Sequence, residues 1–131
     1  MIRYSTNKPV DIEQVIHLYK QSFIELKRPV EDKDKMQALI EHANVVISAW
    51  DNSTLVGLCR GFSDFNFVTY ISDLAVLKEY QNQGIGKELL AKVKDFTDHS
   101  TRLVLLSNVS ANTYYEKLGF SRHDRAWVLD S

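Results

Sequence analysis

The chain has 131 residues, a length that suits one domain with a modest hydrophobic core. Apolar residues make up 44% and the net charge is −1, so we expect a globular protein without the basic field that attracts nucleic acid or an anionic membrane. There is no run of 18 apolar residues, no apolar secretory core after Met1 and a single cysteine, Cys59. These absences predict a cytoplasmic protein with no membrane span and no internal disulfide.

The spacing of apolar residues alternates between helical and extended patterns along the chain. Pro9, followed by acidic residues, marks a helix start, and Gly119 is well placed to end the last helix. The turn cluster at 51–53 separates two β-rich segments and predicts a hairpin. The expected strands are residues 2–5, 45–50, 55–62, 67–76, 102–107 and 120–129, and the expected helices are 12–23, 31–42, 84–96 and 110–118.

This order of elements is β-α-α-β-β-β-α-β-α-β. Hairpin-linked strands with helices segregated between them are typical of an α+β layer with a largely antiparallel sheet. We find no internal repeat, linker or low-complexity segment. The chain is therefore expected to form a single domain over residues 1–131.

The most informative segment is a glycine-rich loop between a predicted strand and the longest predicted helix. Glycines let the main chain approach an anion closely and adopt φ values that other residues avoid. The first free N–H groups of the following helix, together with its dipole, favour negative charge at this point. The loop therefore predicts a phosphate site made by main-chain donors. It consists of Gln81, Asn82, Gln83, Gly84, Ile85 and Gly86, followed directly by Lys87, which adds a positive charge.

Two familiar phosphate-binding motifs do not fit this loop. A dinucleotide fingerprint needs a third glycine and an acidic residue about 20 positions further on, and both are missing here. A P-loop needs an upstream glycine and a Ser or Thr after Gly-Lys, whereas Glu88 follows Lys87. The glycines alone are also compatible with a helix start at which they serve only packing.

The loop resembles the pyrophosphate loop Q/R-x-x-G-x-G/A of the GNAT N-acetyltransferases, which Gln81, Gly84 and Gly86 match. An L-x-V run precedes it at Leu74-Ala75-Val76. A second motif of the family, N-x-x-A-x-x-x-Y-x-x-x-G-F, follows one helix and one strand later. The resemblance covers residues 44–120, and before residue 44 it is limited to the helical pattern. The second motif is matched by Asn108, Ala111, Tyr115, Gly119 and Phe120.

The resemblance implies the GNAT acyltransferase fold, a mostly antiparallel mixed sheet flanked by about four helices. In this fold the strands equivalent to 67–76 and 102–107 splay apart, and acetyl-CoA lies between them. The loop 81–87 would bind the pyrophosphate, and the strand backbone would pair with the pantetheine arm and the acetyl carbonyl. An ordinary helix cap is the alternative role of Asn108. The implied cofactor-binding residues are Leu74, Ala75, Val76, Gln81, Asn82, Gln83, Gly84, Ile85, Gly86, Lys87, Asn108, Ala111 and Tyr115.

The resemblance also implies catalytic roles. Tyr115 matches the tyrosine beside the cofactor sulfur, where its phenol can protonate the leaving thiolate; the alternative is an aromatic ring packed on the sheet. Many relatives carry a glutamate as general base where this chain has Ser72. Asp73 is the neighbouring candidate, although an ideal strand turns it to the opposite face unless a bulge redirects it. A water molecule relayed by Ser72 is an equal alternative for the role of general base. No His or Cys spacing indicates a metal site.

We therefore expect an acetyl-CoA-dependent N-acetyltransferase that moves the acetyl group to a primary amine by direct attack. Two rivals remain: a non-catalytic acyl-CoA-binding module on the same fold, and an interaction domain with purely structural glycines. Relatives often dimerise through C-terminal strands, and a homodimer is possible here through 120–129. The residues expected near the acceptor are Phe23, Glu25, Trp50, Arg60, Asp64, Phe65 and Phe67.

Overall fold

A five-stranded sheet in the order β1-β2-β3-β4-β5 organises the chain, whose computed structural model describes residues 1–130. The first three pairings are antiparallel, and β4 and β5 are parallel. The strands are β1 (Ile2–Ser5), β2 (Val45–Asp51), β3 (Thr54–Ser63), β4 (Val68–Val76) and β5 (Arg102–Leu105). The helices are α1 (Ile12–Lys20), α2 (Lys33–Glu41), α3 (Ile85–Thr97) and α4 (Asn112–Lys117), with short 3-10 turns η1 (Lys78–Tyr80) and η2 (Val109–Ala111).

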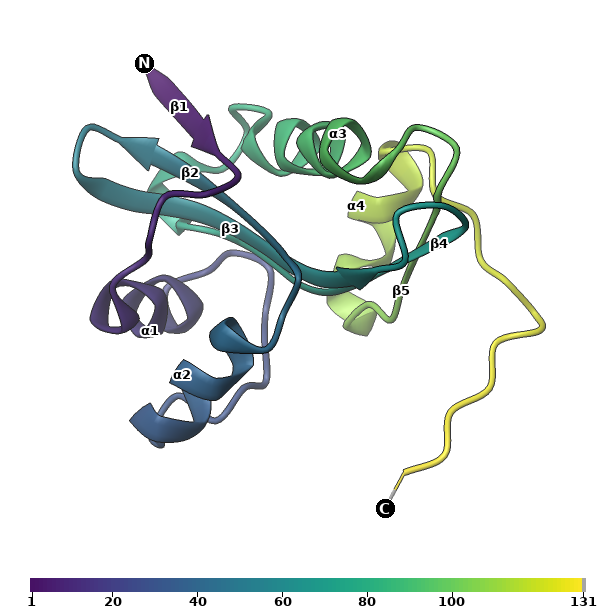
Figure 1. Cartoon of the computed structure of the whole chain (residues 1–131), viewed down its shortest axis with the longest axis horizontal. Coiled ribbons are helices and arrows are strands. Elements are labelled where there is room, and N and C mark those ends of the chain that lie inside the picture. The colour runs from purple at the N-terminus through teal and green to yellow at the C-terminus, as the bar shows by residue number, and fades with distance from the viewer. Residues whose placement is uncertain (131) are drawn as a thin grey trace.

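The helices cover both faces of the sheet. Helices α1 and α2 lie on one side, and α3 runs along the other side over β2, β3 and β4 (Figure 1). The apolar stripes of α1 and α3 face the sheet, as their periodicity predicts. The core between these layers contains the fully buried side chains of Val15, Leu18, Met36, Ile47, Leu58, Leu74 and Leu89.

Strands β4 and β5 separate after a short parallel ladder. They pair only from Val68 with Arg102 to Ile71 with Leu105, while β4 continues to Val76. Beyond this ladder the chain after β5 turns away into η2 and α4. The splayed pair that the GNAT resemblance implies is therefore present, and the fold prediction is confirmed.

A bulge interrupts β4 at the point where it leaves β5. Arg60 of β3 pairs with Asp73, but the next residue, Gly61, pairs with Ile71. Ser72 is therefore the extra residue of β4, and it bends the strand locally. The bulge changes which way the side chains around it face, which decides the surroundings of Asp73.

Two predicted elements differ from the structure. The first helix ends at Lys20 because Ser22 forms an isolated bridge with Leu77, which requires extended backbone. The predicted strand over 120–129 is wrong, because no strand forms after α4 within the described residues. This segment runs away from the sheet (Figure 1) and is solvent-exposed from residue 121 to 130. A strand needs a partner edge for its hydrogen bonds, and an apolar pattern alone does not supply one.

Candidate active site

Helix α3 begins without the side-chain cap that α1 and α2 have. The carboxylates of Asp11 and Asp32 accept main-chain N–H bonds at the starts of α1 and α2. At the start of α3 the cap residue is Gly84, which offers no side-chain acceptor. The first N–H groups of this 13-residue helix are therefore left for an external acceptor.

The loop before α3 has the backbone shape that its glycine predicts. Gly84 has φ 77° and Asn82 has φ 64°, both in the left-handed region. Gln81 to Gly84 are exposed, whereas Ile85 and Gly86 are buried against the body of the protein. Left-handed residues of this kind occur in loops whose successive N–H groups bind anions.

The register of β4 with β3 shows which main-chain groups of β4 face the gap, the space that opens between β4 and β5 beyond their parallel ladder. The N–H of Leu77 donates to the carbonyl of Val56 at 3.0 Å, so the peptide groups of Leu77 and Ala75 face β3. Peptide groups alternate in direction along an antiparallel strand. Those of Leu74 and Val76 therefore face the gap, and that of Ala75 does not.

The two gap-facing residues are not equally free. The carbonyl of Val76 accepts the N–H of Phe23 at 3.0 Å, and its own N–H lies 3.4 Å from the hydroxyl oxygen of Ser22. Val76 thus anchors the segment that follows α1. The peptide group of Leu74 is the one that faces the gap beside the pocket described next.

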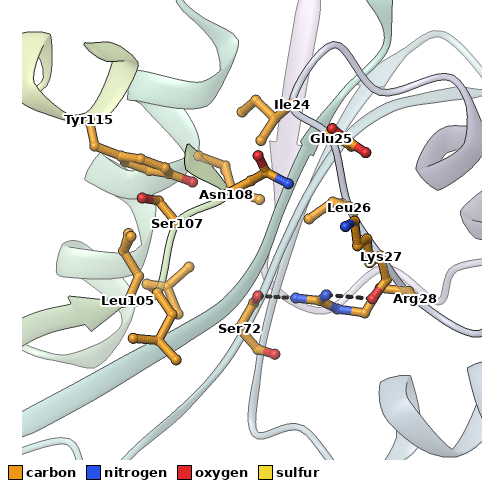
Figure 2. A pocket seen from close by; sticks show the side chains of 13 residues that line it. Ile24, Glu25, Leu26, Lys27, Arg28, Ser72, Leu105, Ser107, Asn108 and Tyr115 are labelled. Atoms are coloured by element: carbon orange, nitrogen blue, oxygen red, sulfur yellow. Dashed lines mark hydrogen bonds between the residues drawn. The ribbon is translucent and has the colours of Figure 1, made fainter. Parts of the chain in front are cut away.

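A pocket of about 160 Å³ lies where β4 and β5 diverge (Figure 2). Residues 71, 72 and 74 of β4 contribute one side. The segment 24–28 forms one wall, and residues 105–108 with Tyr115 form the opposite wall. Sites for drug-sized ligands usually occupy about 300–1,000 Å³. This pocket therefore suits a compact group or one end of a larger molecule.

Tyr115 closes the pocket from α4. Its ring packs edge-on against Tyr114 and Phe120, and only 8% of the residue is exposed. Figure 2 shows its hydroxyl on the side of the pocket occupied by Ser107 and Asn108. Burial, with smaller contributions from neighbouring Tyr114 and Cys59, raises the pKa of Tyr115 well above its usual value. The phenol therefore stays protonated at neutral pH.

Asn108 lines the same pocket and also caps a turn. Its side-chain oxygen accepts from the N–H of Ser110 at 3.0 Å at the start of η2. The amide –NH₂ carries two further donors on the pocket side of the residue. Both the capping role and the binding role are compatible with this position, while Ala111 is buried and does not line the pocket.

Asp73 is buried beneath the pocket, and its carboxylate accepts hydrogen bonds from three side chains. Its carboxylate accepts from Tyr19 Oη at 2.7 Å, Arg28 Nε at 2.6 Å and Arg60 Nε at 2.5 Å. Burial by itself raises the pKa of Asp73, but Arg60, Arg28 and Tyr19 together outweigh burial and lower the pKa. A carboxylate whose pKa is lowered by two guanidinium groups and that accepts three short hydrogen bonds is a poor acceptor for the proton of an amine. This geometry does not support the predicted role of Asp73 as the base.

Sequence reasoning missed Arg28 and Tyr19, which hold Asp73 from 45 and 54 residues away. No local pattern signals such contacts. Of the residues expected near the acceptor, Glu25 lines the pocket, whereas Arg60 is buried below it. Phe65, which follows β3, packs against Phe96 of α3 instead.

A second, larger hollow of about 860 Å³ lies between α3, β5 and α4 and shares Tyr115 and residues 105–107 with the pocket. Basic residues border it, among them Lys87 and Arg102. Within residues 1–130 no group of three or more His, Cys, Asp or Glu side chains is arranged to hold a metal ion. None of the helices in that range has the length and apolar character that crossing a bilayer requires.

Comparisons with known proteins agree with this geometry. Residues 12–120 match the family model described as Acetyltransferase (GNAT) family. An uncharacterized N-acetyltransferase, ycf52, of Pyropia yezoensis is 28% identical over 127 residues, which are 91% of this chain and 70% of the relative. The GNAT-family acetyltransferase SP0256 of Streptococcus pneumoniae has a TM-score of 0.71 at 24% identity, with both chains fully covered. The CoA complex of aminoglycoside N-acetyltransferase AAC(6')-Iy has a TM-score of 0.76 at 17% identity, covering 100% of this chain and 95% of that one.

The chain belongs to the GNAT family of acetyltransferases. The prediction of an acetyltransferase enzyme from two short motifs is thereby confirmed. The solved structures share the fold at low identity, so they add nothing about which amine is the acceptor.

Proposed function

We propose that this protein is an acetyl-CoA-dependent N-acetyltransferase that acetylates a primary amine by direct attack. The observation that carries the proposal is the uncapped start of α3 beside the splayed strands β4 and β5. One end of the gap offers main-chain donors for a pyrophosphate. The other end holds a compact pocket with a phenol and a free strand edge.

Acetyl-CoA would extend from the loop along the gap. The N–H groups of Ile85, Gly86 and Lys87 would hold the pyrophosphate, with Asn82 and Gly84 shaping the loop. The pantetheine arm would then pass Asn108 and reach the pocket with the thioester. Family membership supports acetyl-CoA as the cofactor, and binding by this chain is part of the proposal.

The free peptide group of Leu74 is placed to bind the thioester in its reacting form. As the amine nitrogen attacks the carbonyl carbon, negative charge develops on the carbonyl oxygen. A main-chain N–H fixed in a strand stabilises that charge without having to reorient. The C–S bond then breaks, the nitrogen loses a proton, and CoA leaves as a thiolate.

Tyr115 would act on that thiolate as a hydrogen-bond donor. A thiol has a pKa of about 8.5, and the pKa of Tyr115 lies above the ordinary value of about 10 for a phenol. Complete transfer of the phenolic proton is therefore uphill. The phenol stabilises the thiolate by donating a hydrogen bond, and the proton released by the amine ends on the sulfur.

The amine must react uncharged, and the carboxylate that lines the pocket, that of Glu25, lies on the segment 24–28 and not on β4, where the family glutamate lies. Ser72 occupies that position, with its hydroxyl 2.8 Å from Arg60 Nη2 and 3.3 Å from Asp73 Oδ1. We propose that water beside Ser72 carries the proton of the ammonium form to solvent before attack; the second proton, which the nitrogen loses after attack, is the one that ends on the sulfur. Acceptors with a lower amine pKa should therefore react faster at neutral pH.

A homodimer is a further part of the proposal. Strand β5 is the last strand of the sheet, so its outer edge has no strand neighbour among residues 1–130. The segment after α4 carries Trp127 and Leu129 with more than nine-tenths of their surface exposed. Pairing of this segment with the β5 edge of a second copy would give that edge a strand neighbour and cover the two exposed side chains. Light scattering at micromolar concentration should give twice the chain mass, and a monomer would contradict this part.

Turnover is tested by following thiol release from acetyl-CoA with pairs of amines. Isoamylamine and its N,N-dimethyl derivative differ in the N–H bonds that acetylation requires. We expect release of CoA and an acetylated product only with primary amines, and intersecting initial-rate lines because both substrates bind before reaction. Parallel lines would contradict direct attack. Binding of acetyl-CoA without turnover of any amine would favour the non-catalytic module.

A further inference from the structure

The cluster beneath the pocket holds one more positive than negative charge. Asp73 is ion-paired with Arg28 and Arg60 at the same time, and its side chain has no exposed surface. Tyr19 adds a neutral hydrogen bond. A single carboxylate therefore offsets one of two guanidinium charges, and the second is uncompensated within the cluster. The exposed side chains of Glu25 and Lys27 on the pocket wall offset each other in charge, so the excess of the cluster attracts an anion to the pocket.

Arg28 carries that excess to the pocket. Its guanidinium has five N–H donors, and three are engaged, by Asp73, the Lys27 carbonyl and the Ser72 carbonyl. The two other donors belong to Nη1 and Nη2. The side chain is 26% exposed and lines the pocket, where Figure 2 shows it beside Ser72. Arg28 is thus held in place and still has donors to offer.

The wall that carries Arg28 is fixed to β4 at both ends. At its start the N–H of Phe23 donates to the carbonyl of Val76, and at its end Arg28 Nη2 donates to the carbonyl of Ser72 at 2.7 Å. Residues 24–27 span the distance between these anchors. Arg28 is therefore a preorganised cation, in contrast to its neighbour Lys27, whose side chain is exposed to solvent.

The distance from Arg28 to the reacting centre sets the size of the acceptor. Ser72, which Arg28 contacts, lies two residues before Leu74, so the two peptide groups are at most about 7 Å apart, the rise of a regular strand, and the bulge at Ser72 shortens this span. An amine attacking the thioester beside Leu74 would have the guanidinium within reach of an anionic group a few bonds from its nitrogen. A carboxylate on the same compact molecule fits this spacing and the planar fork of an arginine.

We propose that Arg28 binds the carboxylate of the acceptor, and that the acceptor is a compact amine that carries a carboxylate close to its nitrogen, as an amino acid does. This inference rests on the proposed acetyltransferase function and names the substrate class of its site. Asp73 is then a positioning residue, because it fixes the guanidinium and contacts no substrate itself. A free amino acid and a peptide that begins with an acidic residue present the same chemistry.

The test compares acceptors that differ only in the carboxylate. L-leucine is paired with isoamylamine, and L-phenylalanine with phenethylamine, because each amine is the decarboxylated form of its partner. A second arm compares the peptide amides Asp-Ala-Ala and Asn-Ala-Ala to distinguish a free amino acid from a peptide terminus. Thiol release from acetyl-CoA gives kcat and KM for each acceptor. We expect the carboxylate-bearing member of a pair to have at least tenfold higher kcat/KM, about 1.4 kcal/mol.

Arg28→Gln should abolish that preference by raising the KM of the carboxylate-bearing acceptor, with the KM of acetyl-CoA unchanged. Arg28→Lys should restore little, because the three donors of an ammonium cannot replace the planar fork that contacts Asp73, two main-chain carbonyls and an acceptor carboxylate. Lys20→Gln removes an exposed charge at the end of α1, outside the pocket, and should keep the preference. Thermal unfolding of each variant shows whether it is folded.

Equal turnover of both members of each pair by a folded wild type would overturn the inference and leave the proposed function standing. The same holds if Arg28→Gln slows both members equally. Failure to bind acetyl-CoA or to acetylate any amine would instead contradict the proposed function itself.

Discussion

The hydroxyl of Tyr114 on α4 lies where a side chain at position 86 of α3 would begin. A Cβ atom added to Gly86 collides with that hydroxyl and comes close to the ring carbon that bears it. Gly86 is therefore needed for the contact between the two helices, whatever it contributes to binding. The adjacent glycine behaves differently, because a Cβ atom at Gly84 meets nothing within 4 Å.

This contact predicts the outcome of Gly86→Ala. Tyr114 must move away, and overpacking of this kind costs about 1–3 kcal/mol of unfolding free energy. Combining the change with Tyr114→Phe removes the colliding oxygen and should recover much of the loss. Urea denaturation of the two single variants and the double variant measures the coupling. Additive losses would contradict the contact.

Asp73→Asn should be among the most destabilising single substitutions in the chain. It leaves Arg28 and Arg60 with no carboxylate between them, and breaking a buried ion pair costs about 3–5 kcal/mol. Urea denaturation at pH 7 measures the loss. Glu13→Gln, which breaks an exposed ion pair with Lys33, is the control and should change stability little.

The same substitution has a pH signature. The pKa of Asp73 is lowered in the folded protein, so its ionisation stabilises the fold above the unfolded-state value of about 3.9. That stabilisation is lost as the pH falls through the folded-state pKa. The gap in stability between wild type and Asp73→Asn should therefore shrink below pH 4. A gap of constant size down to pH 2 would argue against an ionised Asp73.

Tyr115→Phe should lower kcat by about 10²-fold, the range that a positioned proton or hydrogen-bond donor contributes. The KM of acetyl-CoA should not change, because the phenol acts on the departing sulfur. Tyr114→Phe is the neighbouring control and should retain kcat. Both are measured by thiol release with the same amine.

Because the pKa of Tyr115 is raised, its phenol stays protonated through the alkaline range. Wild-type kcat should rise with pH as the amine loses its proton and should not fall up to about pH 10. A decline with an apparent pKa below 10 would contradict the role given to this tyrosine.

The loop 81–87 could be predicted from the sequence because its signal is local. Glycine spacing, the strand before it and the helix after it all lie within about 25 residues, and the structure has each of them in place. The second family motif, from Asn108 to Phe120, is local in the same sense. The identification of the family rested on these two short segments.

The surroundings of Asp73 could not be predicted in this way. Its partners Tyr19 and Arg28 reach it from the first quarter of the chain, and the bulge at Ser72 turns it toward them. The sequence indicated that a bulge could redirect this carboxylate, but it did not indicate that two arginines contact it. Long-range contacts of polar side chains leave no periodic trace in a sequence.

The prediction of a strand over 120–129 was wrong for a related reason. An apolar run such as Trp127, Val128 and Leu129 predicts a buried strand, yet all three residues are exposed. Whether such a segment becomes a strand depends on a partner edge, which the residues themselves do not encode.

The central claim, that the start of α3 binds the cofactor pyrophosphate, is tested most directly by calorimetric titration of acetyl-CoA into three proteins. Gly84→Ala and Gly119→Ala both force a side chain into the left-handed region in open space, at similar strain of about 1–2 kcal/mol. We predict micromolar or tighter binding by wild type and by Gly119→Ala, and at least about tenfold weaker binding by Gly84→Ala. Equal affinity of all three proteins, or no binding by the wild type, would contradict the claim.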